Sequence, residues 1–209
     1  MGDLLDDQRL LQKEADKVVE VLQLQALLSG IGNPIRVGSS AMGLMVRRDI
    51  DITVVCEGLS TKTHADFSQV AAKLMLMDRY VLAVRFRNDT GVWNRDPVSY
   101  PDGLYLGVSA RLTDGIDWTL DIWLIDQPER QPDLNHLRTL LPRLDDGRRK
   151  TILQIKQALA EAKTDASESK IPSAYVYEAV VDHGIDGVKQ FSKWLVSKKG
   201  IKSSVSTAV

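Results

Sequence analysis

The chain has 209 residues and a mass of 23.2 kDa, enough for one ordinary domain or one catalytic unit with a small appendage. Its 27 basic and 28 acidic residues give a net charge of −1, which excludes attraction to DNA or membranes by overall charge and leaves open a local basic patch. The single cysteine, Cys56, excludes an internal disulfide framework and a zinc site built from cysteines.

The beginning of the chain carries acidic residues, Asp3, Asp6 and Asp7, where a signal or transit peptide would carry basic and apolar ones. No apolar run approaches the roughly 20 residues that a membrane span requires. We therefore expect a cytoplasmic protein with no membrane partner and with its cysteine reduced.

The first part of the chain predicts helices and strands in turn. Apolar residues recur at spacings of three, four and seven over residues 3–29, which predicts an amphipathic helix ended by Gly30 and Gly32. We expect a short strand at 35–37, a helical turn at 41–46 and a strand at 49–55, where polar and apolar residues alternate. A helix is predicted at 61–78, with Thr61 or Thr63 as its cap.

The middle of the chain is rich in predicted strands, at 80–87, 104–112 and 116–125. Residues 88–102 hold several turn-forming dipeptides and are expected to be mostly loop. The dipeptide Asp114-Gly115 predicts a hairpin between the last two strands.

From residue 128 onward the pattern is helical, with helices predicted at 130–141, 148–162, 173–181 and 187–198. Residues 165–170 are expected to be a polar linker. The order of elements predicts an α+β fold, a small mixed β-sheet flanked by helices with a helical C-terminal half. We expect a catalytic-type domain at 1–127, a helical region at 128–200 and a flexible tail at 201–209.

The segment that carries chemistry is residues 37–52, which read VGSSAMGLMVRRDIDI. Residues two apart in a strand point to the same face, so Asp49 and Asp51 project together. Two such carboxylates repel each other unless a cation lies between them, and hard oxygen ligands beside a phosphate site are what Mg²⁺ prefers. Before them, Gly38 allows a ligand to approach the backbone, while Ser39 and Ser40 offer hydroxyl and N–H groups at the start of a helical turn.

A third carboxylate is expected on the strand at 116–125. Asp117, Thr119, Asp121 and Trp123 share one face of that strand by alternation. Asp121 lies between Leu120 and Ile122, where a charge is costly unless it is paired or bound to a metal. Asp117 lies next to the hairpin and is explained as a solvated strand end, so we select Asp121.

These residues resemble the signature of the nucleotidyltransferase superfamily that includes DNA polymerase beta. That signature is a hydrophobic residue, Gly-Ser, a spacer of about ten residues and an alternation of acidic and hydrophobic residues. Val37-Gly38-Ser39 and Asp49-Ile50-Asp51-Ile52 match it, and Asp121 stands where the later acidic residue is found. The chain departs from many small members at Arg47-Arg48, because these members place a serine directly before the first aspartate.

The resemblance implies a mixed sheet flanked by helices and a reaction that moves an NMP from an NTP to a hydroxyl acceptor with release of pyrophosphate. It implies that Asp49, Asp51 and Asp121 are catalytic and bind Mg²⁺. The predicted nucleotide-binding residues are Gly38, Ser39, Ser40 and Arg48. The acceptor is unidentified and is a small molecule, RNA or protein, and the oligomeric state is open.

Two other functions remain open from the sequence. One is a non-catalytic nucleotide- or RNA-binding module on the same fold, suggested by Arg47-Arg48 and by the lysine-rich C-terminal stretch. The other is a toxin-like transferase that acts on tRNA or protein.

Several other residues have two interpretations. Arg48 either steers phosphates or pairs with the nearby aspartates. The basic residues of the helix at 148–162, including Lys156, either reach a triphosphate or form a solvated face, which we favour. Phe191 and Trp194 among the C-terminal lysines either contact nucleic acid or form the core face of a helix, which we also favour. Trp93 either stacks on a ligand or lies on the surface.

Overall fold

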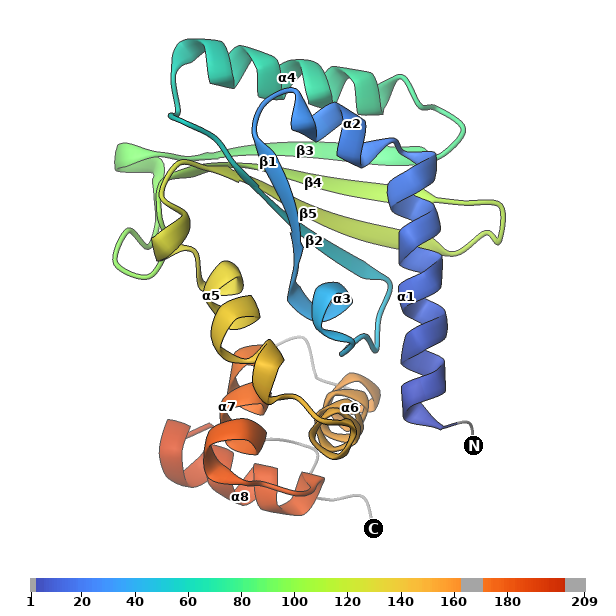
Figure 1. The fold of residues 1–209 in the computed structure, drawn as a ribbon, viewed down its shortest axis with the longest axis vertical. Helices are drawn as coiled ribbons and strands as arrows, with labels where there is room; N and C mark the ends of the chain where they lie inside the picture. The colour runs from blue at the N-terminus through green and yellow to red at the C-terminus, as the bar shows by residue number, and fades with distance from the viewer. Residues whose placement is uncertain (1–2, 163–170, 202–209) are drawn as a thin grey trace.

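The computed structural model describes residues 3–162 and 171–201, so the predicted linker at 165–170 and the predicted tail from 202 onward lie outside the described residues. Helices and strands alternate through the first part, and helices make up the rest (Figure 1). The helices are α1 Leu4–Val21, α2 Leu24–Ser29, α3 Gly38–Met42, α4 Thr61–Met75, α5 Pro132–Thr139, α6 Asp146–Glu161, α7 Ser173–His183 and α8 Val188–Lys199, and the 3-10 turns are η1 Gly91–Trp93, η2 Pro128–Arg130 and η3 Leu141–Arg143.

The strands form one mixed sheet of five strands in the order β1-β2-β5-β4-β3. β2 and β5 are parallel neighbours, and the other pairs of neighbours are antiparallel. The mixed sheet flanked by helices confirms the predicted fold class. The strands are β1 Asn33–Val37, β2 Asp49–Val55, β3 Val81–Asp89, β4 Gly103–Arg111 and β5 Asp117–Ile125.

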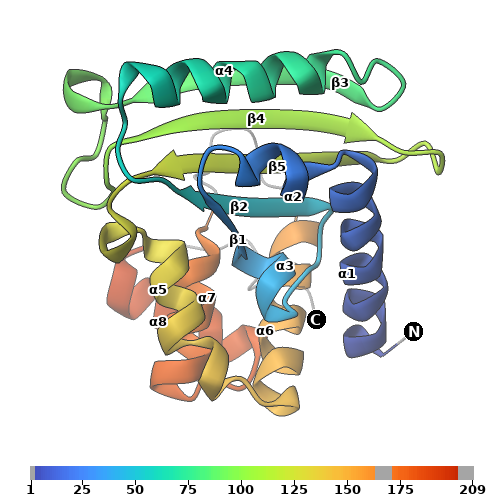
Figure 2. The same ribbon diagram turned by 45° about the horizontal axis from the view of Figure 1, so that its top comes forward.

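One face of the sheet is covered by α1, α2 and α4 (Figure 2). Alternation along β2 and β5 sends Ile50, Ile52 and Leu120 into this core, so the residues between them point to the other face. Phe67 of α4 is fully buried against the same cluster. This face is therefore closed by apolar packing, and the opposite face is left for polar side chains.

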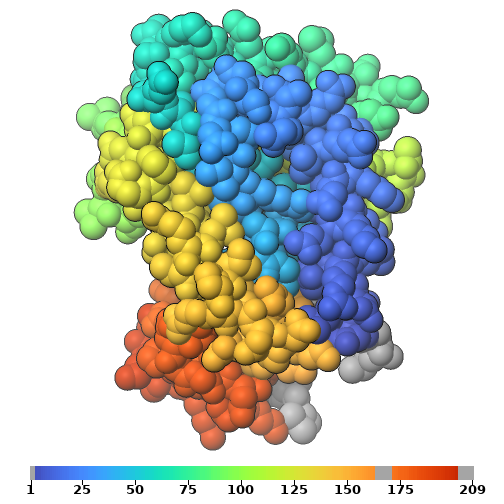
Figure 3. Space-filling view, in the orientation of Figure 1, coloured from blue at the N-terminus to red at the C-terminus, as the bar shows by residue number. Residues whose placement is uncertain are grey.

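A second apolar cluster joins α6, α7 and α8. Met42 of α3 and Leu44 belong to this cluster, so the segment between β1 and β2 packs against the C-terminal helices. These helices form one end of the molecule, with α1 along the side (Figure 3). Phe191 and Trp194 are buried in the cluster, which confirms that they form the core face of their helix.

The predicted helix at 3–29 is wrong as a single element, because it breaks between α1 and α2. Gln23 adopts a left-handed conformation with φ of 50° at the break. Leu22 and Leu24 would point about 200° apart on a straight helix, whereas both are fully buried in the structure. The break therefore lets both side chains reach one core.

Other predicted boundaries also differ. The helical turn expected at 41–46 is instead α3, which begins at Gly38 and ends at Gly43, whose φ is 70°. Ser60 caps α4 through its side chain, in place of the threonines expected. The helix expected at 130–141 is divided into η2, α5 and η3. Pro132 and Pro142 lie within the first two positions of α5 and η3, because proline lacks the N–H group needed inside a helix. The hairpin at Asp114-Gly115 is confirmed by the pairing of β4 with β5.

Within the described residues, no helix has the length and apolar content needed to cross a membrane.

We predict that Leu22→Ala lowers the free energy of unfolding by about 2–5 kcal/mol, because the fully buried side chain leaves a cavity. Leu10→Ala, within α1, is the control, since that side chain is 59% exposed and its loss should change stability by less than about 0.5 kcal/mol. Urea denaturation followed by circular dichroism measures both. Equal effects would contradict the burial of Leu22 in the core.

Candidate active site

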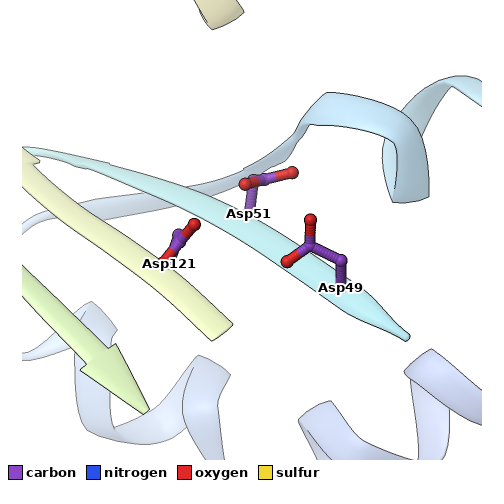
Figure 4. Close-up of side chains that lie close together, drawn as sticks. All are labelled: Asp49, Asp51 and Asp121. Carbon is purple, nitrogen blue, oxygen red and sulfur yellow. The ribbon is translucent and has the colours of Figure 1, made fainter. Parts of the chain in front are cut away.

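β2 and β5 bring three carboxylates together at the start of the parallel pair. Asp51 lies directly opposite Asp121 in the register, and Asp49 precedes Asp51 by two residues on the same face. One oxygen from each carboxylate lies within 4.8 Å of the others, and the three side chains are half-buried (Figure 4). The three residues that the sequence selected as metal ligands therefore meet in space.

The electrostatics of this cluster centre on Asp51. Burial raises the pKa of Asp51 to about 8, and the neighbouring charges of Asp49, Asp133 and Asp121 contribute, while Lys156 opposes them. A divalent cation among these oxygens would compensate this excess of negative charge. The donor set is three hard oxygens and is accessible, so the residues present fit Mg²⁺.

Gly38 is required where β1 turns into α3. Its φ of 65° lies in the left-handed region, and a Cβ built there would overlap the Oδ2 atom of Asp51. The Asp51 carboxylate therefore rests on the backbone of Gly38. This contact gives a steric reason for the Gly-Ser sequence, in addition to the close approach of a ligand.

Tyr105 of β4 orients Asp121, and sequence reasoning missed this residue. Its hydroxyl donates a hydrogen bond to Asp121 Oδ1. The tyrosine reaches across Gly107, because a Cβ on that glycine would lie 2.6 Å from the Tyr105 hydroxyl. Arg85 donates to the same hydroxyl at 3.4 Å. The feature that points to Tyr105 is its position opposite Trp123 in the pairing of β4 with β5. This position places the tyrosine ring beside Asp121, which lies on the same face two residues before Trp123.

Asp49 is held by the neighbouring strand. The hydroxyl of Thr119, directly opposite in the register, donates a 3.0 Å hydrogen bond to Asp49 Oδ1. Asp117 lies at the exposed start of β5 and forms an ion pair with Arg111, which lowers the pKa of Asp117. The structure therefore separates Asp121 from Asp117 in the way that the sequence predicted.

Helices α5 and α6 contribute groups to the carboxylate side of the sheet. Burial raises the pKa of Asp133 on α5, and the charge of Asp121 adds to the effect while His136 opposes it. Lys156 of α6 donates to the carbonyl of Leu44 at 2.6 Å and lowers the pKa of Asp51. The predicted solvated position of Lys156 is therefore wrong, because its side chain points inward.

The predicted nucleotide-binding residues differ in their placement. Ser39 is half-buried in the first turn of α3, beside Gly38. Ser40 is 1% exposed, and its hydroxyl bonds to the carbonyl of Val37 and accepts from Arg36. The Ser40 hydroxyl is therefore used within the fold.

Arg48 is not brought to the carboxylates. Its guanidinium lies 3.0 Å from Glu14 and 4.0 Å from Asp114, and 5.8 Å from the centre of the Trp118 ring. Trp118 belongs to the buried face of β5, opposite to the face of Asp121. We expected Arg48 to contact either a phosphate or the nearby aspartates. Its position beside Glu14 and Trp118 supports neither contact.

A cavity of about 440 Å³ adjoins the cluster. Asp51 and Asp121 line it, together with Val37, Trp123, Gln131 and Asp133. A cavity of this size accommodates a small molecule or one unit of a polymer.

Comparisons with known proteins give matches at the level of structure. No family model and no curated protein matches the sequence. A mutant of the Cid1 poly(U) polymerase bound to MgATP matches with a TM-score of 0.58 at 15% identity, over 84% of this chain and 50% of that chain. A cytoplasmic RNA terminal U-transferase matches with a TM-score of 0.55 at 15% identity, over 83% of this chain and 49% of that chain.

CdnC from E. coli MS115-1, solved in complex with HORMA-deltaN, matches with a TM-score of 0.52 at 16% identity, over 91% of this chain and 66% of that chain. The chain thus spans about half the length of the two transferases and about two thirds of CdnC. These proteins have the nucleotidyltransferase fold, and the likeness shows that the present chain has this fold as well. The resemblance inferred from residues 37–52 is confirmed for the fold.

We predict that Gly38→Ala weakens metal binding by more than about tenfold, because the added methyl group displaces the Asp51 carboxylate. Gly115→Ala is the matched control, since Gly115 has a similar φ of 74° but no atom within 4 Å of an added Cβ. Both variants carry the backbone strain, and only the first disturbs the carboxylate. Calorimetric titration with Mg²⁺ or Mn²⁺ distinguishes them, and equal affinities would contradict the steric role of Gly38.

We predict that the metal-free protein loses stability as pH rises toward 8. Asp51 has a pKa of about 8 in the folded protein and an ordinary pKa of 3.8 in the unfolded chain. Between these two pH values the folded protein keeps a proton that the unfolded chain has released. The free energy of unfolding therefore falls as pH rises from about 4 to about 8. Asp51→Asn should therefore melt higher than wild type at about pH 8, by about 2–4 °C per kcal/mol relieved, with no difference at about pH 4.

Thermal melting in EDTA measures this effect. Asp117→Asn is the control, because the pKa of Asp117 is lowered by Arg111 and its contribution is lost as pH falls, which is the opposite trend. Parallel melting curves for wild type and Asp51→Asn at every pH would refute the assignment.

Proposed function

We propose that the protein is a Mg²⁺-dependent nucleotidyltransferase that moves an NMP from an NTP to an acceptor hydroxyl and releases pyrophosphate. The observation that carries this proposal is the meeting of Asp49, Asp51 and Asp121 within 4.8 Å, beside the turn at Gly38. The fold supports it, because solved structures with this fold include the Cid1 poly(U) polymerase, bound to MgATP in one structure and described in another by its RNA terminal uridylyl transferase activity.

Asp49, Asp51 and Asp121 would hold the metal. Bound Mg²⁺ supplies positive charge to the phosphates and lowers the cost of ionising the acceptor hydroxyl. Asp51 is fixed by its contact with Gly38, and Asp49 by the hydrogen bond from Thr119. The ligand oxygens are thus oriented before a nucleotide arrives, which reduces the entropy lost on binding.

In the proposed reaction the acceptor oxygen attacks the α-phosphorus of the NTP. A new phosphorus–oxygen bond forms as the bond from the α-phosphorus to the bridging oxygen breaks, and the electron pair leaves with pyrophosphate. Tyr105 occupies Oδ1 of Asp121, so Oδ2 is the oxygen placed to ligate on the acceptor side or to take the acceptor proton. Ser39, in the first turn of α3, would contact the triphosphate.

We also propose that residues 1–127 form the catalytic unit and that residues 128–200 close the acceptor side. The separate apolar clusters around the sheet and around the C-terminal helices support this division. Asp133 of α5 reaches the cavity from the second part, which supports a role for that part in shaping the site.

We predict that Asp49→Asn, Asp51→Asn and Asp121→Asn each lower NMP transfer by more than about a hundredfold while the fold persists. Asp117→Asn is the matched control on the same strand face and should keep full activity, because Asp117 pairs with Arg111 away from the cluster. The assay uses α-labelled NTPs and Mg²⁺ with RNA, protein and small-molecule acceptors.

Calorimetry with ATP gives a second measurement that needs no acceptor. We expect binding that requires Mg²⁺ and is lost in Asp49→Asn. Full activity in the aspartate variants would refute the proposed mechanism, and salt-sensitive RNA binding without NTP binding would favour the non-catalytic module instead.

A further inference from the structure

The segment between β1 and β2, residues 38–48, connects two parts of the carboxylate cluster, and we call it the α3 loop. It begins at Gly38, whose backbone supports the Asp51 carboxylate, and it leads directly into Asp49 at the start of β2. A displacement of the α3 loop would therefore move the support of one carboxylate and the backbone of another. The contacts that hold this loop are thus contacts that maintain the geometry of the cluster.

Side chains from two other helices bind carbonyl groups of the α3 loop, because α3 lies beside both α1 and α6 (Figures 1 and 2). Gln12 Nε2 of α1 donates to the Ser40 carbonyl at 2.8 Å, and Arg149 Nε of α6 donates to the Met42 carbonyl at 3.3 Å. A helix leaves its last four carbonyl groups without partners inside the helix. These two side chains therefore satisfy groups at the end of α3 from positions 28 and 107 residues away in the sequence.

Arg149 also binds the segment that precedes α6. Its Nη1 atom donates to the Leu144 carbonyl at 2.8 Å. Met42 and Leu144 both belong to the apolar cluster of the C-terminal helices, so one planar guanidinium joins the α3 loop to that cluster. The Arg149 side chain is 23% exposed, and charge-assisted hydrogen bonds are stronger where water is partly excluded.

Close packing around Gly43 restricts the end of α3. Gly43 has a φ of 70°, and a Cβ built there would lie 3.4 Å from Arg149 Nε and 3.4 Å from Gln8 Nε2. Gln8 of α1 is 5% exposed, and its Nε2 atom lies 3.5 Å from Gln12 Oε1. Side chains of α1 and α6 therefore both contact the turn at which α3 ends.

Lys156 lies seven residues after Arg149, which is almost two full turns, so the two cations share one face of α6. Lys156 donates to the Leu44 carbonyl of the α3 loop, and it also lowers the pKa of Asp51. Its loss would therefore change the electrostatics of the cluster directly. Arg149 instead contacts the loop and the start of α6, so its effect on the cluster is transmitted through the loop.

We propose that Arg149 is a positioning residue of the metal site and acts on it through the α3 loop. The inference rests on the proposed function and names the way in which the C-terminal helices control that same site. Arg149 holds the Met42 carbonyl, and the loop in turn keeps Gly38 under Asp51 and fixes the backbone that leads into Asp49. Gln12 supports the same loop from α1. A movement of α6 against the sheet would therefore change the affinity for the metal.

Binding of Mn²⁺ to the full chain without nucleotide tests the proposal, with electron paramagnetic resonance of the free ion or calorimetry as the readout. We expect Arg149→Ala to weaken Mn²⁺ binding by about tenfold, at the lower end of the effect of groups that orient metal ligands. Arg149→Lys should recover part of the affinity, because its ammonium group reaches one carbonyl group. Gln12→Met should weaken binding by roughly threefold, because it removes the donor to Ser40 and keeps the length of the side chain.

Arg148→Ala is the matched control. Arg148 precedes Arg149 on α6, donates to the Arg143 carbonyl at 2.9 Å and pairs with Asp145 at 3.0 Å. These contacts lie before and at the start of α6, as the bond from Arg149 to Leu144 does, and they do not involve the α3 loop. The control should bind Mn²⁺ as wild type does, and circular dichroism verifies that each variant has folded.

Hydrogen exchange in the metal-free protein reports on the loop itself. The Leu44 N–H donates to the Ser39 carbonyl at 3.0 Å within the loop. Peptides that cover residues 38–48 should therefore exchange faster in Arg149→Ala than in Arg148→Ala or wild type.

A double-mutant cycle with Gly38→Ala separates positioning from a general loss of stability. The methyl group of Gly38→Ala already displaces the Asp51 carboxylate, so adding Arg149→Ala should weaken Mn²⁺ binding by clearly less than it does in the wild-type background. In the transfer assay, Arg149→Ala should need about tenfold more Mg²⁺ for its half-maximal rate and should approach the wild-type rate at saturating Mg²⁺.

Equal Mn²⁺ affinity in Arg149→Ala and Arg148→Ala, additive effects with Gly38→Ala, or absence of Mn²⁺ binding by wild type would overturn the proposal. Should Arg149→Ala not fold, unchanged affinity in Gln12→Met would overturn it instead. Mn²⁺ binding with the expected effects but no NMP transfer to any acceptor would contradict the proposed function and leave the positioning role standing. Transfer by wild type together with unchanged Mn²⁺ affinity in Arg149→Ala would refute only the positioning role.

Discussion

The structure depends on holding three carboxyl groups together at the start of one parallel strand pair. Asp49, Asp51 and Asp121 would repel one another in an apolar setting, and burial raises the pKa of Asp51 to about 8. The protein tolerates this cost because each carboxylate has a local support, namely Gly38 under Asp51, Thr119 on Asp49 and Tyr105 on Asp121. A site arranged in this way is unfavourable when empty of cations, and it is therefore ready to bind one.

The topology of the sheet creates the cluster. β2 and β5 run in the same direction with Asp51 opposite Asp121, so residues about 70 positions apart in the sequence face each other. The apolar faces of both strands pack under α1, α2 and α4, which fixes the register and leaves the acidic faces on the other side. Leu44 and Lys156 then connect this side to the C-terminal helices, so the geometry of the carboxylate cluster and the helical packing are coupled.

Tyr105 contacts both the carboxylate cluster and the residues that line the cavity, because Arg87, Tyr105 and Trp123 stack on one another. Tyr105 orients Asp121 through its hydroxyl, and its ring packs against Arg87, which lines the cavity. Gly107 makes both contacts feasible by leaving room for the tyrosine to cross the strand. A change at this position would thus disturb both the carboxylate cluster and the lining of the cavity.

The sequence by itself determined the fold class, the strand of Asp49 and Asp51, and the choice of Asp121, because alternation and the cost of a charge between apolar neighbours are local properties. It could not place Arg48, Lys156 or Tyr105, since their partners come from elements distant in the chain. Arg48 pairs with Glu14 on the far face, and Gln131 is buried at a cavity wall that exists only once α5 meets the sheet. Only the tertiary structure decided these contacts, because they arise from packing between strands and helices and not from the spacing of residues.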